Sequence, residues 1–472
     1  MLATPHDRKP HAFYAVTPPV QALAPSPQGP LQGLRVVDLS RLVAGNMLTL
    51  QLGDFGADVI KLESTGGGDT LREWREAHPD HPEGFDGWWR VYGRNKRSLA
   101  LNLRDGDAMA WLRRLLITAQ VMVESFRPGT LEAMGLSPAD LHALNPRLVI
   151  VRLSGWGQSG PYRELPGFGS LIEGFSGLAD KHRDAQGRPQ LPNLALADMV
   201  TGLTGAFAVL AAVREVEVRG GCGQVVDLSL LEPMLAIMGP DVTNLGATGR
   251  VAEPGRKIAS PRGVYRCSDG RWVSMSGSTD TMARRVFAAI GQGALFDDPR
   301  YASNAARLAH DHEIDAMVAD FIAGLTQADA LALFRAQGVT VGPIHDAASL
   351  LSDAHVAARG AYLRLDEGLG DAPTVMHAVT PRLQGTPGAV HRRAPLHGEH
   401  GAALLAELGA SAEALKALIA RGALDAPTGP GVQEAAVLRD PLGQAAGSGV
   451  DQGAGPTDPL FGDKTHPGFP GN

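Results

Sequence analysis

One carboxylate is distinguished by its surroundings. Asp198 follows Leu196 and Ala197 at the end of an apolar run in LPNLALADMVTGLTGAFAVLAAV, and small residues and a helical pattern come after it. An aspartate at this place can cap the helix by accepting hydrogen bonds from the unpaired backbone N–H groups at its start. It can instead take part in chemistry, as carboxylates with perturbed acidity do. Its immediate neighbours favour the cap and leave the reactive alternative open.

Positive charge gathers in the segment YGRNKRSLALNLRDGDA. Arg94, Lys96 and Arg97 precede an alternating strand pattern, and Arg104 lies just beyond it. Such a cluster suits a polyanion, because Arg and Lys pair with phosphates through charge-assisted hydrogen bonds. A solvated basic loop explains the same charges equally well.

Other patterns give weaker signals. Gly66, Gly67 and Gly68 could cradle a phosphate, but a dinucleotide fingerprint needs spaced glycines directly after the first strand. Gly45 is the only glycine in that first turn, SRLVAGN, so an ordinary loop is favoured for the later glycine run. No histidine pair has the acid and the helical spacing of a zinc site, and we expect no metal. The absence of a G-x-S-x-G elbow and of a P-loop gives hydrolase and kinase functions no support.

The elements that must position these side chains alternate along the first third of the chain. Short apolar runs such as LRVVDLS, DVIKLE, VMVES and RLVIVRLSG are interleaved with helical patterns such as AMAWLRRLLITAQ. This alternation is typical of βαβ units and a mostly parallel sheet. After Arg214 the pattern changes, and GVYRCSDGRWVSMSGS predicts a hairpin with its turn at Asp269 and Gly270. A second, smaller unit is therefore expected.

Composition limits the class of protein. A chain of 472 residues exceeds what one core usually organises, so two packed units or one elaborated α/β domain are expected. The net charge of −7, without a long basic run, argues against a nucleic-acid partner. Two cysteines, Cys222 and Cys267, fit a reducing compartment. The sequence has no apolar run of about 18 residues, the length that predicts a membrane span, so we expect no membrane association.

Both ends of the chain have unusual composition. Residues 1–30 hold many prolines and no continuous apolar segment, which predicts an irregular N-terminal arm. Residues 421–472 become rich in Gly, Pro and Ala from about Asp425, which predicts a low-complexity, disordered tail.

Six segments together resemble the class III CoA-transferases, the family of formyl-CoA transferase, carnitine CoA-transferase and the methylacyl-CoA racemases. In chain order they are LQGLRVVDLSRLVAGNMLTLQLGDFGADVIKLESTGGGD, GRNKRSLALNL, VMVESFRPGTLEAMGL, LNPRLVIVRLSGWGQSGPY, GGCGQVVDLSLLEPM and RAPLHGEHGAALLAELG. The resemblance covers about residues 31–420 and keeps the order and spacing of the family.

The resemblance implies an α/β fold with a Rossmann-like large domain and a smaller α+β domain. Residues 31–225 would form the first part of the large domain, 226–355 the small domain, and 356–420 the return to the large domain. It further implies a homodimer whose two chains interlock like rings.

The resemblance also implies the role of Asp198. In the transferase branch, the catalytic aspartate lies about 20 residues after a Ser-Gly pair, which here is Ser176 and Gly177. The family's carboxylate attacks an acyl-CoA thioester to give a mixed anhydride, which the CoA thiolate converts into an aspartyl-CoA thioester. We therefore expect an acyl-CoA donor, a carboxylate acceptor, coenzyme A as substrate rather than as a permanently bound cofactor, and a cytoplasmic enzyme.

Contacts to CoA can be carried over in the same way, to the first βα turn and to segments after two later strands. The expected residues are Arg41, Leu42, Val43, Ala44, Leu101, Arg104, Ser125 and Phe126. Val43 replaces a glutamine that shapes the site of formyl-CoA transferase, so a formyl or oxalate specificity is not implied. Glu173 is a second carboxylate upstream of Asp198, an acid/base or structural partner.

Two alternatives to CoA transfer remain. A racemase needs two acid/base groups on opposite faces of the α-carbon, but Phe168 stands in place of the racemase histidine, and Gly169 and Thr279 in place of two carboxylates. A non-catalytic CoA-binding partner subunit is the other alternative. It is suggested by the segment VSMSGSTDT, where Gly277 alone represents the family's glycine loop.

Overall fold

The structure of the protein, a computed structural model, describes residues 18–78, 81–184, 186–253, 255, 257–368 and 372–426. The chain divides into two units, and all of the described residues belong to the first, Met1–Pro427. Most of the predicted tail and the first 17 residues of the predicted arm lie outside the described residues.

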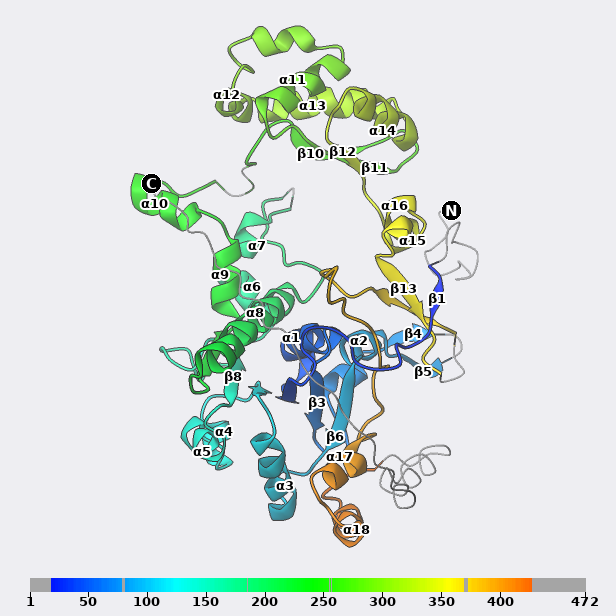
Figure 1. Ribbon diagram of the computed structural model, residues 1–472. Helices are drawn as coiled ribbons and strands as arrows, with labels where there is room; N and C mark the ends of the chain where they lie inside the picture. Colours follow the sequence, from blue (N-terminus) through cyan, green and yellow to red (C-terminus); the bar gives the residue numbers. More distant parts are fainter. Residues whose placement is uncertain are drawn as a thin grey trace, which may run out of the picture. The chain divides into compact units, whose positions relative to one another are not determined.

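Six parallel strands build the central sheet (Figure 1). Their order across the sheet is β6 (Lys96–Ala100), β3 (Asp58–Glu63), β2 (Arg35–Leu39), β7 (Val121–Glu124), β8 (Val149–Ser154) and β9 (Val225–Ser229). Counted along the chain, this is the order 3-2-1-4-5-6 of the doubly wound fold that binds dinucleotides. The predicted Rossmann-like α/β architecture is confirmed.

Helices cover both faces of this sheet (Figure 1). One face packs against α1 (Leu42–Asp54) and α8 (Leu196–Arg219), and the other against α3 (Gly106–Ile117), α17 (Gly401–Glu407) and α18 (Ala412–Ala420). Successive strand residues alternate between the two cores, as Val36 and Val37 do. The strands are therefore apolar on both sides, which explains why they are continuous apolar runs in the sequence.

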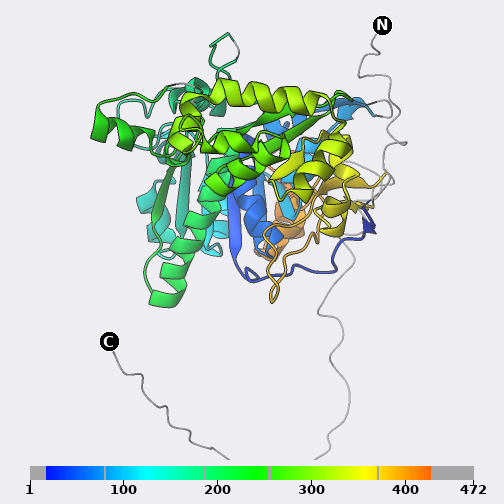
Figure 2. The same cartoon turned by 90° about the horizontal axis from the view of Figure 1, so that it is seen from above.

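The helices α1 and α8 lie side by side, as the view from above also shows (Figure 2). Two glycines of α8 allow this approach. A Cβ at Gly202 would lie 2.6 Å from the Cβ of Met47 and 2.8 Å from the carbonyl oxygen of Ala44, and Gly205 is packed against Leu48. In the described part of the chain, α8 is the only single helix that is long and apolar enough to cross a membrane. The buried core helices of soluble proteins pass the same test.

A separate antiparallel sheet has its own apolar core. Its strands are β10 (Arg262–Arg266), β11 (Trp272–Ser276) and β12 (Val341–Pro343), and its helices are α11 (Asp280–Ala289), α13 (Asp311–Ala323) and α14 (Gln327–Ala336). The pairing of β10 with β11, and a positive φ of 78° at Gly270, confirm the predicted hairpin. The boundaries predicted for the domains stay a prediction.

A further small sheet joins the predicted arm to strands from a late part of the chain. The arm contributes β1 (Val20–Gln21), which pairs with β13 (Tyr362–Leu365), and β13 pairs with β14 (Thr374–His377). Further short elements are β4 (Glu76–His78), β5 (His81–Phe85), α2 (Gly87–Tyr92), α4 (Thr130–Ala133), α5 (Pro138–Leu144), α6 (Gly169–Phe175), α7 (Leu178–Lys181), α9 (Leu231–Ile237), α10 (Asp241–Thr248), α12 (Asn304–Ala309), α15 (Ala347–Leu351) and α16 (Ala354–Ala358).

The structure corrects the start of the predicted tail. Residues 421–426 are ordered, because Ala423 and Leu424 are apolar side chains that become buried in the core beneath α3 and α18. The backbone N–H of Asn102 donates to the carbonyl of Ala423 at 3.0 Å, and that of Asp425 to Ala100 at 3.1 Å. The composition of the segment does not reveal these contacts, because their partners lie in a distant part of the sequence.

The packing of α1 on α8 generates a stability prediction. The substitution Gly202→Ala should lower the free energy of unfolding by about 1–3 kcal/mol, since the added methyl group meets backbone and Cβ atoms that cannot rotate away. Urea unfolding followed by circular dichroism measures the change. Gly246→Ala in α10, where a Cβ would meet nothing within 4 Å, should instead be neutral or stabilising by up to about 1 kcal/mol. Equal stabilities of Gly202→Ala and the wild type would contradict this account.

Candidate active site

The strand order reverses between β2 and β7, and ligands of doubly wound folds bind at the carboxyl ends of such strands. Here the backbone N–H of Arg41, after β2, donates to the Ser125 hydroxyl, after β7, at 3.0 Å. A cavity of about 620 Å³ opens at this edge. Four of the predicted CoA residues line it, namely Arg41, Leu101, Arg104 and Phe126.

Two cations at this cavity can receive an anion. Arg41 and Arg104 are both exposed. The Arg41 guanidinium donates to the Thr70 hydroxyl at 2.6 Å, and neither guanidinium forms an ion pair with a carboxylate in the described part of the chain. Phosphate groups are the anions that such a pair of arginines recognises best.

The basic cluster before β6 has a different role. Arg94 and Lys96 are fully buried. Arg94 pairs with Asp54 at the end of α1, Lys96 Nζ lies 3.4 Å from Asp38, and Arg97 pairs with Asp58 at 2.7 Å. These three residues are neither a solvated loop nor part of the cavity lining, since each is engaged by a carboxylate inside the fold.

The glycine run forms a tight turn beside the cavity. Gly66 and Gly68 have positive φ values of 83° and 75°, which residues with a Cβ rarely adopt. The Gly66 N–H already donates to the Asp425 carboxylate at 2.7 Å. The ordinary-loop interpretation therefore holds for Gly66, while Gly68 contributes to the cavity wall.

Asp198 lies in the first turn of α8, but it does not cap the helix. The N-cap residue is Ala195, which has no capping side chain. The buried Glu173 of α6 supplies the cap instead, because its carboxylate accepts a hydrogen bond from the Ala197 N–H at 3.1 Å. The capping interpretation of Asp198 is thus wrong, and Glu173 is the structural partner that the sequence left open.

The environment of Asp198 changes its acidity. Burial, and after it the negative charge of Glu173, raise the pKa of Asp198 to about 6, against the opposite effect of hydrogen bonds from its own N–H and from the Ala44 N–H. Ala44 is the third residue of α1, where backbone N–H groups have no partner within the helix. The carboxylate therefore faces the positive end of a neighbouring helix.

Small and apolar residues surround this carboxylate. Gly169 of α6 lies so close that a Cβ built there would overlap Asp198 Oδ2. Val43, Trp89 and Met199 belong to one apolar cluster beside it, together with Tyr92. Burial raises the pKa of the Tyr92 hydroxyl, and Asp198 contributes to that rise, which places the two groups within electrostatic reach.

The first turn of α1 connects the cavity to Asp198. Arg41 lines the cavity, Val43 is buried in the apolar cluster, and Ala44 donates to Asp198. Leu42, Val43, Ala44 and Ser125 are absent from the cavity lining. Val43 and Ala44 lie toward Asp198, whereas the Ser125 hydroxyl accepts from the Arg41 N–H at the cavity edge.

Sequence reasoning missed Asp69, which lines the cavity and binds the start of α1, and Lys61, which pairs with it. Lys61 is a charged residue inside the otherwise apolar strand β3, and that irregularity was the available signal. No group of three or more His, Cys, Asp or Glu that could hold a metal ion occurs in the part of the chain that the structure describes.

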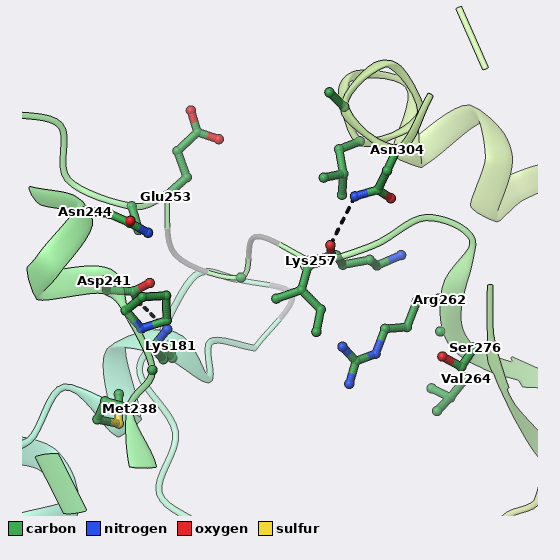
Figure 3. A pocket seen from close by; sticks show the side chains of 18 of the residues that line it. Lys181, Met238, Asp241, Asn244, Glu253, Lys257, Arg262, Val264, Ser276 and Asn304 are labelled. Atoms are coloured by element: carbon green, nitrogen blue, oxygen red, sulfur yellow. Dashed lines mark hydrogen bonds and ion pairs between the residues drawn. The ribbon is translucent and has the colours of Figure 1, made fainter. Parts of the chain in front are cut away.

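A larger hollow of about 1720 Å³ has a different lining (Figure 3). The side chains of Lys181 and Asp241 form an ion pair at one side of it, and Lys257 and Arg262 come from the opposite side. None of the predicted site residues lines this hollow.

The fold and this site define a class of enzyme. The model of CoA-transferase family III matches residues 31–401, and the chain belongs to this family of CoA-transferases. The chain is 36% identical, over 81% of its length and 94% of the relative's, to succinyl-CoA–D-citramalate CoA-transferase of Chloroflexus aurantiacus. It is 34% identical to succinate–glutarate CoA-transferase of Agrobacterium fabrum, over 81% of this chain and 97% of the relative.

Solved structures agree with this assignment. A CAIB/BAIF family protein from Brucella suis superposes with a TM-score of 0.69 at 30% identity, covering 81% of this chain and all of the other. The orthorhombic form of Rv3272 from M. tuberculosis superposes with a TM-score of 0.71 at 27% identity, covering 80% and 100% of the two chains.

The close approach of α6 to Asp198 generates a prediction. Gly169→Ala should lower CoA-transfer activity by about 100-fold or more, because the new methyl group displaces the carboxylate, and misplacement by about 1 Å can cost that much. Steady-state kinetics with an acyl-CoA and a carboxylic acid measure the loss. Gly174→Ala on the same helix, where a Cβ meets nothing within 4 Å, is the matched control and should retain activity. Wild-type kinetics for folded Gly169→Ala would show that the carboxylate's position is unimportant.

Proposed function

We propose that the protein moves CoA between carboxylic acids, with Asp198 as the covalent nucleophile. The observation that carries the proposal is the Asp198 carboxylate itself, partly desolvated and facing the helix turn that also borders the cavity. The relatives named for succinyl-CoA, succinate and glutarate support short dicarboxylic acids as the substrate class.

The reaction proceeds through four transfers at Asp198. Its carboxylate oxygen attacks the thioester carbon, the C–S bond breaks, and CoA leaves as a thiolate beside a mixed anhydride. The thiolate attacks the aspartyl carbon of the anhydride, which releases the donor acid and forms an aspartyl-CoA thioester. The acceptor carboxylate attacks this thioester and again releases the thiolate. The thiolate then attacks the acceptor's acyl carbon and restores the Asp198 carboxylate.

The acidity of Asp198 suits this chemistry. With a pKa of about 6, the side chain is mainly ionised at neutral pH, yet its basicity exceeds that of an ordinary aspartate. The Ala44 N–H that donates to the carboxylate is placed to donate to the oxyanion that forms when the aspartyl carbonyl is attacked.

The cavity beside α1 is the place we propose for the nucleotide part of CoA. Arg41 and Arg104 would pair with its phosphates, while Leu101 and Phe126 offer apolar contacts. The reactive thioester would then reach along the first turn of α1 toward Asp198.

A homodimer is part of the proposal. Large apolar side chains stand exposed on α8 and its neighbours, including Phe207 at 73% and Phe168 at 65% exposure. Others on α6, α8 and α9 are Leu171, Phe175, Leu203, Leu210, Leu235 and Ile237. An apolar surface of this extent needs a partner, and a second, interlocked copy of this chain would cover it.

A second candidate is one subunit of a heteromeric transferase. The alpha and beta subunits of succinyl-CoA–L-malate CoA-transferase from Chloroflexus aurantiacus are 34% and 36% identical to this chain. Exchange of CoA by the purified protein alone would exclude dependence on a partner. Binding of CoA without exchange across a panel of acyl-CoAs and acids would favour dependence on a partner subunit.

The cytoplasmic location stays a prediction.

The nucleophile has a direct test. Asp198→Asn should reduce CoA exchange by at least about 10⁴-fold, as the loss of a covalent nucleophile does, and mass spectrometry should find the CoA adduct on Asp198 in the wild type alone. Asp329→Asn is the matched control, because Asp329 also lies at the third position of a helix. Near-normal exchange by Asp198→Asn would refute the proposed mechanism.

The pH dependence tests the electrostatics. Only ionised Asp198 attacks, so kcat/KM should be lost as the pH falls through about 6. Glu173→Gln keeps an acceptor for the Ala197 N–H but removes a like charge, so the midpoint of this acid limb should move down by about one pH unit. Glu215→Gln, a change near the other end of α8, should leave the limb in place. An unmoved or higher midpoint in Glu173→Gln would contradict the assigned role of Glu173.

A further inference from the structure

We infer that Asp69 is a positioning residue of the active site, whose carboxylate holds the first turn of α1 so that the Ala44 N–H faces Asp198. The inference rests on the proposed function of Asp198. Asp69 does not touch Asp198. Its carboxylate binds the first turn of α1, residues 42 to 44, on the side opposite to Asp198.

Both oxygens of Asp69 are fully engaged. Oδ1 accepts hydrogen bonds from the backbone N–H groups of Leu42, at 3.0 Å, and Leu71, at 2.9 Å. Oδ2 accepts from the Asn46 side chain at 2.7 Å and lies 2.9 Å from Lys61 Nζ. The side chain is 2% exposed. Four donors from four directions therefore fix this carboxylate, and through it the start of α1.

The backbone that Asp69 holds is strained. Leu42 has a φ of 62°, in the left-handed region that a residue with a branched apolar side chain rarely adopts. Such conformations persist where surrounding contacts impose them, and they concentrate at functional sites. Two contacts impose this one, the Leu42 N–H bond to Asp69 and a 2.6 Å bond from the Asn46 side chain to the Leu42 carbonyl. This conformation of Leu42 sets the direction in which the backbone N–H groups of residues 42 to 44 point.

Charge balance keeps Asp69 ionised in the interior. Lys61 and Lys96 face Asp38 and Asp69, and all four side chains are buried. Burial raises the pKa of Asp69, but Lys61 and the N–H groups of Leu71 and Leu42 outweigh burial and hold that pKa well below its usual range. Asp69 therefore stays charged wherever Asp198 titrates.

Two helices meet at this point. The turn from Leu42 to Ala44 is bound by Asp69 on one side and by Asp198 on the other. Gly202 brings α8 against the Ala44 carbonyl, so α8 cannot move to compensate for a displaced turn. Loss of the Asp69 bonds should release Leu42 from its strained conformation and turn the Ala44 N–H away from Asp198.

The test compares two buried aspartates that bind the same helix. Asp69→Ala removes both carboxylate oxygens, and with them the acceptor of the Leu42 N–H and the partner of Lys61. We expect kcat to fall by about 10- to 100-fold and the acid limb of kcat/KM to move above its wild-type midpoint, because ionised Asp198 loses a hydrogen-bond donor. Glu173 and Tyr92, the other polar groups facing Asp198, are unchanged in this variant.

Asp54→Ala is the matched control. Asp54 ends α1, is also buried, and accepts hydrogen bonds from Arg94 and Asn95. It should lower the unfolding temperature while leaving kcat and the acid limb at wild-type values. If Asp69 only stabilised the fold, the two variants would behave alike, and that result would overturn the inference.

A charge-balanced variant guards against misfolding. Asp69→Ala leaves Lys61 without its nearest carboxylate, whereas the double variant Lys61→Met with Asp69→Ala leaves Asp38 facing Lys96. The folded double variant should show the same loss of kcat and the same upward shift. Wild-type kcat and midpoint in either folded variant would refute the positioning role. If Asp198→Asn is inactive at the same time, the proposed function stands; if Asp198→Asn is active, the proposed function itself fails.

Discussion

The approach of the Ala44 N–H to the Asp198 carboxylate, which lowers the pKa of that carboxylate, is the feature on which the rest of the site depends. It requires that two helices start at one place, α1 after β2, the first strand of the sheet along the chain, and α8 about 150 residues later, a separation that the strand order of the doubly wound fold accommodates. Glycines at positions 169 and 202 remove the side chains that would separate the partners. Carboxylates at positions 69 and 173 bind the backbone on either side.

Opposing electrostatic effects meet at this carboxylate. Desolvation and the charge of Glu173 favour the protonated form of Asp198, while two backbone N–H groups favour the ionised form. A fully buried, unassisted carboxylate would be protonated at neutral pH and could not attack, and a fully hydrated one would be a weak nucleophile. The surrounding groups hold the side chain between these limits, which explains why neighbouring positions that contact no substrate still govern reactivity.

Much of this arrangement is visible in the sequence, and the rest depends on distant partners. The apolar runs predict the parallel sheet, and the turn SRLVAGN falls at its switch point. Local reasoning cannot show that Glu173, rather than Asp198, caps α8, because the two lie on different helices. It also cannot show that Arg94 and Lys96 are internal, since their carboxylate partners lie 40 and 58 positions away. Lys61 in an apolar strand was a local irregularity that indicated such a partner.

The bond from Gly66 to Asp425 joins residues 359 positions apart. Residues in or beside the cavity wall, such as Leu101 and Gly66, are therefore bonded to residues synthesised much later in the chain. The hydrogen bonds from Asn102 to Ala423 and from Asp425 to Ala100 close the same edge. During synthesis, the Asn102 N–H and the Ala100 carbonyl stay without these partners until position 425 has emerged. A nascent chain released before that point would have Asp198 and α1 in place, but Leu101 and Asn102 at the cavity would lack their late partners.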